Sequence, residues 1–501
     1  MIRWNSKKYI KSREVFSNLS NEDYFIYCRN KRYRLSNIAK AVWDMVLSFK
    51  EYEFEECDLN EQKILNEFMN REWIRCIGQE LYMKKAPYTI VERFADKYIM
   101  FNTLFGNIEQ CSKEVYEALT DNKLTLLKCE LIDKLYKKNY ICFNEEDDYE
   151  KLVIPDAFFT VYLVFSYACN MSCVYCFEKD KEHKGRMSKQ TLEQACQYIN
   201  DMSKNEKVEI AFYGGEPLLN ANKEYITYTL DKFENNENIF FKFITNGVNV
   251  NQYMELFSRY KKKISGFVIT IDGTEKLHNS KRKMNDGAGT YGIIIRNIVL
   301  LANSGFRVTI RINVSADTLE EQEDSIMIFN NLNCKRENLD INIHQVHNRY
   351  VEKHEDVSLL ECYKLLYAIK KKSIIPVVFV HPFYDVYERV INGDRSYPYI
   401  WEGFCKTRMY RVVDVDGNVY PCSEAMLEKE LCMGNVSGTC MQFPKRMLCA
   451  NNGCFICDYY LLCYGKCNLQ NFIDDKFGRL NCNKDELKKT VRKFSADIGV
   501  I

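Results

Sequence analysis

The run Cys169-Asn-Met-Ser-Cys173-Val-Tyr-Cys176 places three thiols within eight residues. Thiolates are soft ligands that suit iron–sulfur clusters, and a 4Fe–4S cluster held by cysteines alone needs four of them. Three thiolates without a fourth nearby therefore leave one iron open for a small molecule. A zinc knuckle is the alternative, but zinc sites usually take four ligands in paired spacings, and no partner pair follows closely.

The chain around this run alternates between strand-like and helix-like stretches. Ser188 can cap a helix that carries Leu192, Ala195, Cys196 and Ile199 on one face. Apolar or alternating stretches predict six strands: Phe159–Phe165, Val208–Phe212, Ile239–Ile244, Phe267–Ile271, Val308–Val314 and Leu339–Ile343. This βα repeat predicts an α/β fold with a parallel sheet, in which functional residues gather at the carboxyl ends of the strands.

Distinctive residues stand at these strand ends. The second strand runs into Tyr213-Gly214-Gly215-Glu216-Pro217. Two glycines let the backbone approach a ligand closely, and a carboxylate or carbonyl can accept from an ammonium. The next strands end at Thr245-Asn246-Gly247 and Thr270-Ile-Asp272-Gly273. Further polar residues follow at His278, Asn279, Arg282, Arg311 and Asn313. An ordinary polar pair at a strand end would also explain the last two, and a lone histidine is more often structural than catalytic.

A second group of cysteines fills the end of the chain. Ten of the 22 cysteines lie from Cys405 onward. The spacing is Cys405-x11-Gly417-x4-Cys422, then Cys454-x2-Cys457-x5-Cys463-x3-Cys467, then Cys482. In a chain without signs of secretion, such cysteines are more often metal ligands than disulfides. Zinc ribbons are the alternative to iron–sulfur clusters.

Together these motifs resemble the radical S-adenosylmethionine (radical SAM) enzymes, and the C-terminal cysteines resemble the SPASM domain of members that modify peptides and proteins. The resemblance covers roughly residues 156 to 490. It implies a partial (β/α)6 TIM-like barrel at 156–385 and a SPASM domain at 386–501. It also implies that the cofactors are SAM and three 4Fe–4S clusters.

The resemblance also implies ligand sets. Cys169, Cys173 and Cys176 would hold the cluster that binds SAM. An outer auxiliary cluster would be held by Cys454, Cys457, Cys463 and Cys482, and an inner one by Cys405, Cys422 and Cys467. The inner set is one thiolate short, so either Cys432, Cys440 or Cys449 completes it or one iron is open to a substrate thiolate. The residues that would bind SAM are Tyr175, Gly214, Gly215, Glu216, Pro217, Thr245, Asn246, Thr270, Asp272, Arg282, Arg311 and Asn313.

The first 155 residues follow another pattern. Helices are predicted at Leu35–Phe49, Leu59–Met69, Ser112–Leu119 and Leu124–Leu135, strands at Trp73–Cys76 and Tyr140–Phe143, and a hairpin at Tyr98–Ile108. We expect an α+β module at 1–85 and a second small module at 86–155. This region resembles the winged-helix-like peptide-recognition domain fused to many peptide-modifying enzymes, and a generic α/β cap is the alternative.

Composition is that of a globular protein, with 46% apolar and 28% charged residues. A net charge of +1 gives no sign of a nucleic-acid partner, and no apolar stretch predicts a signal peptide or membrane span. We therefore expect a cytoplasmic protein.

The predicted function is that of a radical SAM maturase. It would abstract hydrogen from a Cα or Cβ of a ribosomal precursor peptide and form Cys-to-carbon thioether crosslinks. The N-terminal region would bind the leader of that peptide, and a flavodoxin or ferredoxin would supply electrons. Alternatives are a carbon–carbon crosslink, epimerisation or Ser/Cys oxidation to formylglycine. A non-catalytic iron–sulfur electron carrier or peptide-binding scaffold is the alternative from another class.

Overall fold

The computed structural model describes residues 8–11, 15–20, 23–28, 31–34, 63–64, 67–68, 74–77, 83–121, 123–143, 159–176, 178, 185–346, 356–394, 409–438, 454, 457–478 and 482–501. The chain divides into two compact units. Unit 1 comprises Met1–Val153, Val386–Pro398 and Ser495–Ile501, and unit 2 comprises Ile154–Asp385 and Tyr399–Phe494.

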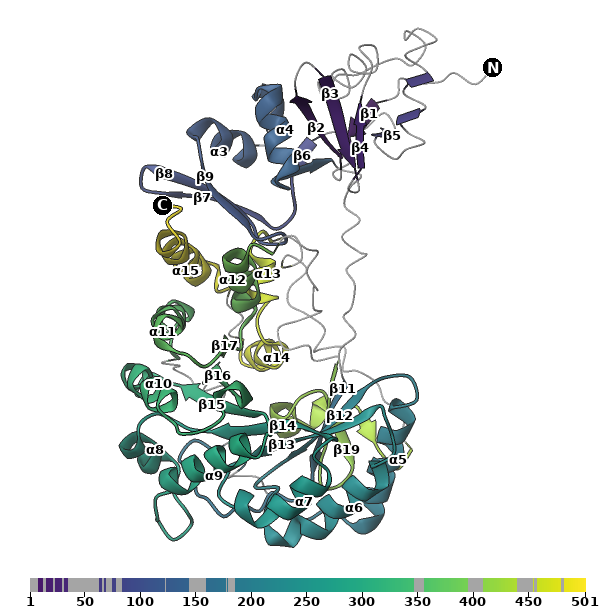
Figure 1. Cartoon of the computed structure of the whole chain (residues 1–501), viewed down its shortest axis with the longest axis vertical. Coiled ribbons are helices and arrows are strands. Elements are labelled where there is room, and N and C mark those ends of the chain that lie inside the picture. The colour runs from purple at the N-terminus through teal and green to yellow at the C-terminus, as the bar shows by residue number, and fades with distance from the viewer. Residues whose placement is uncertain are drawn as a thin grey trace. The chain divides into compact units, whose positions relative to one another are not determined.

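The described part of unit 2 is built on one ten-stranded sheet, with the order β17-β16-β15-β14-β13-β12-β11-β18-β19-β20 (Figure 1). Neighbouring strands from β17 to β18 are parallel, and β19 and β20 add an antiparallel edge. The strands are β11 (Phe159–Val164), β12 (Val208–Tyr213), β13 (Ile239–Thr245), β14 (Ile264–Thr270), β15 (Val308–Val314), β16 (Leu339–Gln345), β17 (Val377–Phe379), β18 (Tyr410–Val413), β19 (Asn418–Tyr420) and β20 (Gly434–Asn435).

The six strands predicted from apolar patterning are all present as β11 to β16, and the parallel α/β arrangement is confirmed. Patterning did not identify β17 and β18, which are three and four residues long. A strand that short gives too few alternations to stand out from a loop. Strand β18 extends the sheet beyond β11, with Thr160 opposite Tyr410 and Leu163 opposite Val413.

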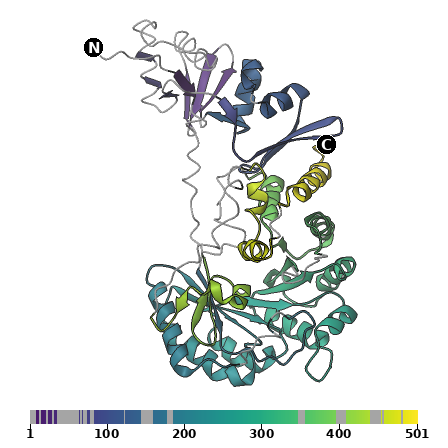
Figure 2. The same ribbon diagram turned by 180° about the vertical axis from the view of Figure 1, so that it is seen from behind.

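Helices connect the parallel strands and lie along the outer side of the sheet, as α6, α7 and α9 do in both views (Figures 1 and 2). Ser188 caps α5 as predicted, because its side chain accepts from the Thr191 N–H at 3.0 Å. The α-helices of the sheet region are α5 (Lys189–Met202), α6 (Lys223–Phe233), α7 (Met254–Arg259), α8 (Glu275–Lys281), α9 (Tyr291–Asn303), α10 (Gln322–Asn330), α11 (Leu359–Lys372) and α12 (Pro382–Asn392); after the sheet come α13 (Tyr460–Cys463), α14 (Asn468–Lys476) and α15 (Lys484–Asp497).

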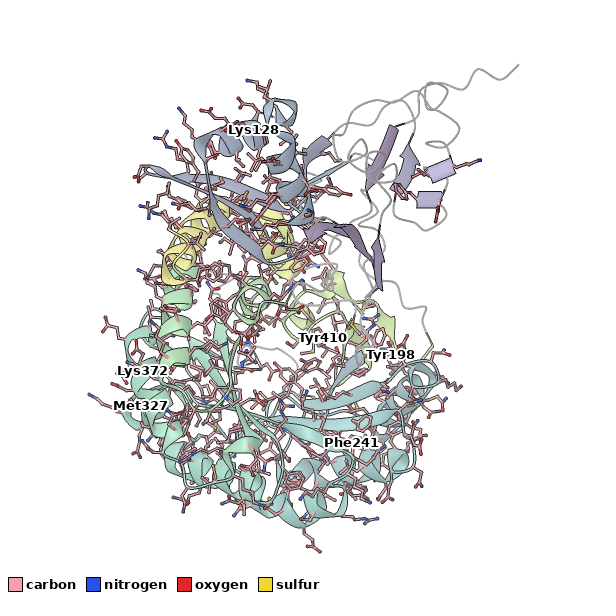
Figure 3. The ribbon with its side chains drawn as sticks, turned by 45° about the horizontal axis from the view of Figure 1, so that its top comes forward. Lys128, Tyr198, Phe241, Met327, Lys372 and Tyr410 are labelled. Carbon is pink, nitrogen blue, oxygen red and sulfur yellow. The ribbon has the colours of Figure 1, made fainter. Side chains whose placement is uncertain are left out.

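Burial alternates along the strands and separates the two faces of the sheet. In β13, Phe241 and Phe243 are fully buried, whereas Lys242 and Ile244 between them are only partly buried. Phe243 lies 4.9, 4.8 and 5.2 Å, between ring centroids, from Phe212, Phe257 and Phe267. The aromatic core thus fills the space between sheet and helices (Figure 3 labels Phe241), and the other face is left more polar.

Unit 1 is built from small antiparallel sheets and short helices. Its described elements are β1 (Lys8–Lys11), β2 (Val15–Ser20), β3 (Asp23–Cys28), β4 (Lys31–Arg34), β5 (Ile74–Ile77), β6 (Met83–Lys85), β7 (Thr89–Phe94), β8 (Lys97–Asn102), β9 (Asn107–Cys111), α3 (Lys113–Thr120), α4 (Cys129–Lys137) and β10 (Ile141–Phe143). The predicted hairpin is confirmed as β8 and β9, which β7 extends to three strands. The helix predicted at Leu35–Phe49 lies outside the described residues, and the one at Leu59–Met69 is described only in part.

One prediction in unit 1 was wrong in detail. We expected a single helix at Leu124–Leu135, but the structure has a 3-10 turn at Leu124–Leu126 and then α4. Leu127 and Lys128 are extended between them, and Leu127 is buried in the core of unit 1. Apolar spacing alone could not show that burying Leu127 requires a break. The predicted domain boundaries and the winged-helix-like assignment stay predictions.

No helix in the described ranges combines the length and apolar character that crossing a membrane requires.

We expect Phe243→Ala to destabilise unit 2 by about 3–5 kcal/mol, because it empties the centre of the aromatic core. Urea denaturation followed by tyrosine and tryptophan fluorescence measures the shift in midpoint. Ile374→Ala is the matched control, since Ile374 is 62% exposed, and its effect should stay within about 0.5 kcal/mol. Equal midpoints for the two variants would contradict this account of the core.

Candidate functional site

The cysteine run forms a loop directly after β11. Its backbone is held by the last residue of α8 and the segment that follows it: the Ser172 N–H donates to the Lys283 carbonyl at 2.9 Å, and the Val174 N–H to the Lys281 carbonyl at 3.0 Å. The Asn285 side chain donates to the Cys169 carbonyl at 3.0 Å. The loop is thus fixed by backbone pairing, which leaves its thiols available.

Cys169, Cys173 and Cys176 are all partly buried and lie close enough to influence one another electrostatically. Burial raises the pKa of all three thiols, that of Cys169 to about 12. In the described ranges no group of three or more His, Cys, Asp or Glu side chains converges tightly enough for a single metal ion. Three neighbouring thiols are the type of ligand that an iron–sulfur cluster uses.

Tyr175 lies within the cysteine loop and connects this loop to the ends of β14 and β15. Its hydroxyl donates to the Asp272 carboxylate and accepts from Arg282 Nη1 at 2.7 Å. Asn313 Nδ2 lies 3.3 Å from Asp272 Oδ1, and Arg311 Nε donates to Asn313 Oδ1 at 3.1 Å. Five of the twelve residues predicted to bind SAM therefore form one network. Burial raises the pKa of Tyr175, so its hydroxyl stays protonated.

Arg282 has capacity left for an anion. Its side chain is 9% exposed and lies 4.0 Å from Asp272, while its buried Nε has no hydrogen-bond partner. An unpaired buried donor is costly unless a ligand satisfies it. Thr270, the other residue predicted to hold the SAM carboxylate, ends β14 opposite Arg311 and is partly exposed. The hydrogen-bond donors of Arg282 and Thr270 suit a carboxylate ligand.

The two glycines after β12 allow a close approach between two parts of the backbone. Gly214 has φ +111°, and a Cβ there would lie 2.7 Å from the Ser166 carbonyl oxygen. A Cβ on Gly215 would collide with the carbonyls of Tyr167 and Ala168. The described contact is with the backbone leading to Cys169, and the close approach to a ligand stays a prediction. The glycines bring β12 and the cysteine loop together.

Glu216 is also engaged by the protein. It is 1% exposed, and its carboxylate accepts from Thr245 Oγ1 at 2.6 Å, from the Asn246 N–H at 2.7 Å and from the Leu218 N–H at 2.8 Å. Burial raises its pKa, and these hydrogen bonds oppose the rise. The carboxylate therefore ties the end of β12 to the Thr245-Asn246 turn. Pro217, next to it, is buried.

Asn246 reaches from that turn to the cysteine loop. Its Nδ2 donates to Asn170 Oδ1 at 2.8 Å and lies 3.8 Å from Cys169 Sγ. Sequence reasoning missed Asn170 and Asn285, because a single Asn in a loop carries no periodic or spacing signal.

His278 and Asn279 hold the loop around Arg282. The Asp272 N–H donates to His278 Nδ1 at 3.3 Å, and His278 Nε2 lies 3.0 Å from Thr290 Oγ1. Burial lowers the pKa of His278 to about 3, so the ring is neutral. Asn279 Oδ1 accepts from the N–H groups of Thr290 and Tyr291 at 2.8 and 3.0 Å, at the start of α9. A neutral amide at position 279 therefore serves a structural purpose.

The structure brings together only part of the C-terminal array. Cys454 and Cys457 lie near enough to Cys463 to raise its pKa, which burial, the larger cause, brings to about 11. Cys482 is exposed, and no described contact joins it to these three. Cys405, Cys440 and Cys449 lie outside the described residues.

A set of tyrosines links the sheet to the remaining cysteines. Tyr162 on β11 lies 5.3 Å from Tyr213 and 5.9 Å from Tyr410, between ring centroids (Figure 3 labels Tyr410). Tyr162, Tyr167 and Tyr213 pack on the same apolar cluster as Cys422 and Cys467. The start of the cysteine-rich extension is therefore continuous with the sheet beside the cysteine loop.

Comparison with known proteins agrees with this geometry. Residues 163–326, from β11 into α10, match the family model described as Radical SAM superfamily. The chain is 23% identical over 295 residues to the radical SAM cyclopropyl synthase TigE of Paramaledivibacter caminithermalis, covering 50% of this chain and 61% of that protein. It is 25% identical over 327 residues to a cysteine-type anaerobic sulfatase-maturating enzyme of Clostridium novyi, covering 60% of this chain and 84% of that protein.

Among solved structures, SuiB of Streptococcus suis bound to the precursor peptide SuiA aligns with a TM-score of 0.45 and 13% identity, over 92% of this chain and 95% of that one. Residues 163–326 thus resemble the radical SAM superfamily, and this resemblance implies SAM and at least one 4Fe–4S cluster as cofactors.

We expect Glu216→Gln to destabilise the SAM-free protein by about 1–3 kcal/mol, because an amide must present a donor where the carboxylate accepts. Thermal unfolding without SAM measures the loss. Glu224→Gln is the control, because Glu224 is an exposed partner of Lys189. Unchanged stability together with weakened SAM binding would instead make Glu216 a direct SAM ligand.

Proposed function

We propose that this enzyme modifies a ribosomally made peptide, forming thioether crosslinks between a Cys sulfur and a Cα or Cβ. The observation that carries the maturase proposal is the continuity of the cysteine-rich extension with the radical SAM sheet through β18. A reaction that leaves an oxidised product needs a place for electrons beside the radical site, and additional clusters would provide it. The thioether outcome itself rests on the resemblance of the cysteine motifs.

Cys169, Cys173 and Cys176 would hold the cluster that binds SAM. When bound, SAM and the clusters supply the radical chemistry, and the protein supplies position and exclusion of water. Arg282 offers its unpaired Nε to the SAM carboxylate, with Thr270 beside it. Tyr175 and Asp272 hold that guanidinium in place through hydrogen bonds. No described side chain is needed as an acid or base.

The proposed partners are a precursor peptide, with its leader on the N-terminal modules, and a flavodoxin or ferredoxin as reductant in the cytoplasm. The described hairpin and helices of unit 1 are compatible with a small peptide-recognition module. The proposal also includes two auxiliary clusters, held by the cysteines predicted above for the outer and the inner cluster.

Formylglycine formation is the second candidate, since a sulfatase-maturating enzyme is among the relatives. That alignment covers 60% of this chain, so a large part of the sequence has no counterpart in it. This disfavours the same substrate. A carbon–carbon crosslink, an epimerisation and a non-catalytic scaffold make different predictions in the experiments below.

We expect Cys173→Ala to reduce 5′-deoxyadenosine formation from SAM and dithionite to background, because the cluster loses one of three ligands. Tyr175→Phe should lower the rate by about 10–100-fold, as loss of an outer-sphere partner does. Anaerobic turnover followed by chromatography measures both. Cys334→Ala, outside both cysteine groups, is the control and should keep the full rate. An inactive wild type with intact clusters would favour the scaffold.

We expect the intact mass of the substrate peptide to fall by about 2 Da for each crosslink, as the loss of two hydrogens requires. The candidate substrate is a short Cys-containing peptide encoded beside the gene. Alkylating its thiols beforehand should abolish the change. A mass loss that survives alkylation would indicate a carbon–carbon crosslink or oxidation of a Ser to formylglycine, and would overturn the thioether proposal. An unchanged mass in water with deuterium uptake in D2O would indicate epimerisation and overturn the thioether proposal.

A further inference from the structure

The polar face of the large sheet, the face turned away from the aromatic core, carries an arginine with donors to spare. We propose that Arg311, with Asn342 and His344 beside it, binds a carboxylate of the peptide substrate, either an Asp or Glu side chain or the C-terminal carboxylate. This inference rests on the proposed function and names a feature of its substrate. It assigns Arg311 to the peptide, whereas the resemblance placed this residue among those that bind SAM.

Alternation along β15 turns Arg311 away from the aromatic core. Phe267 belongs to this core and lies opposite Val308 at the start of β15. Neighbouring residues of a strand point to opposite faces, so Val308, Ile310 and Ile312 face the core, and each is fully buried. Arg311 lies between the last two and is only partly buried. Its side chain is therefore on the polar face of the sheet.

Asn342 and His344 lie beside Arg311 on the next strand. Arg311 is opposite Asn342, and Asn313 is opposite His344, and residues opposite each other in a parallel sheet share a face. Arg311 Nε donates to Asn313 Oδ1 at 3.1 Å, which directs the guanidinium toward the end of β15 and so toward His344. Burial, the larger cause, and the charge of Arg311 keep the pKa of His344 well below its ordinary value. The neutral ring offers one N–H donor.

These three side chains have donors that the protein does not use. Apart from the bond to Asn313, Arg311 makes no hydrogen bond or ion pair within the described part of the chain. Over the same residues, Asn342 and His344 make no hydrogen bond. A charge held partly out of water without a counter-ion is unfavourable, and an anionic ligand removes that cost.

Acidic residues of the same face are already paired with other cations. Glu209 on β12 accepts from Lys242 Nζ on β13 at 2.5 Å. Asp340 on β16 accepts from Arg307 Nε at 3.0 Å. The sheet therefore neutralises these two carboxylates locally and leaves the charge of Arg311 for a ligand.

The charge of Arg311 lies inside the curve of the sheet. Burial raises the pKa of Tyr162 on β11 and of Tyr213 on β12, and Arg311 opposes the rise at both. These strands are the fourth and the third along from β15, so in a flat sheet they would lie roughly 14–19 Å away. Curvature brings them near one another, and the guanidinium faces the enclosed side, from which a peptide would approach bound SAM.

SAM does not account for this second guanidinium. Its methionine part carries a single carboxylate, for which Arg282 keeps a buried Nε donor without a partner, and its ribose is neutral. Asn313, rather than Arg311, contacts the Asp272 carboxylate next to that donor. A further anion beside SAM is therefore best supplied by the peptide, and its carboxylate would fix the peptide relative to the adenosyl group.

The test measures peptide binding and does not require turnover. The probe is the Cys-containing segment of the peptide encoded beside the gene, labelled with fluorescein, and fluorescence anisotropy gives its Kd for the reconstituted full chain. We expect Arg311→Gln to raise this Kd by at least about tenfold, as the loss of one charge-assisted hydrogen bond does, and by a larger factor than the Kd for SAM. Arg311→Lys should recover part of the loss. Arg336→Gln is the matched control, because Arg336 is exposed, and should bind like wild type.

Changing the peptide covers the case in which Arg311→Gln misfolds, because only the wild-type enzyme is then needed. Replacing each Asp by Asn and each Glu by Gln, one at a time, should raise the Kd at least tenfold at one position. Amidating the C-terminus should do so instead if the terminal carboxylate is the ligand. An unchanged Kd for all these peptides, or a larger effect of Arg311→Gln on SAM than on the peptide, would overturn the inference alone. A wild-type enzyme that neither binds nor converts the peptide would overturn the proposed function with it.

Discussion

The buried carboxylate of Glu216 is the interaction on which the site depends most. It joins the end of β12 to the turn after β13, and the adjacent glycines let the end of β12 lie close to the backbone leading to Cys169. Three strand ends are therefore fixed to one another before any cofactor binds. Removing this buried carboxylate would leave its hydrogen-bond donors without an acceptor inside the protein, which costs stability. A single substitution in this arrangement is therefore expected to be destabilising.

A second network works from the opposite side. Tyr175 carries the cysteine loop to Asp272 and Arg282, and neutral His278 supports the loop that holds them. The two networks meet at the cysteine loop, one at each end. Among the described side chains of these two networks, Arg282 keeps a buried Nε donor without a hydrogen-bond partner.

Much of this was predictable from sequence, because the relevant signals are local. Apolar alternation predicted β11 to β16, and the cysteine spacing predicted the loop between β11 and α5. Sequence could not show the contacts within the protein: Glu216 and Gly215 were expected to contact a ligand, which stays a prediction, and the structure shows that both also contact neighbouring parts of the chain. Such contacts are set by tertiary packing.

The pairing of β18 with β11 has a consequence for how the chain is made. Thr160 on β11 pairs with Tyr410 on β18, which is synthesised much later. One edge of β11 therefore has no partner strand while the strands from β12 to β17 are synthesised. An unpaired edge invites wrong partners, and closing so long a loop is slow. Order of synthesis thus separates the two cysteine groups in time. The first group is synthesised directly after β11, before the other strands of the sheet, and the second is synthesised together with β18, which pairs with β11.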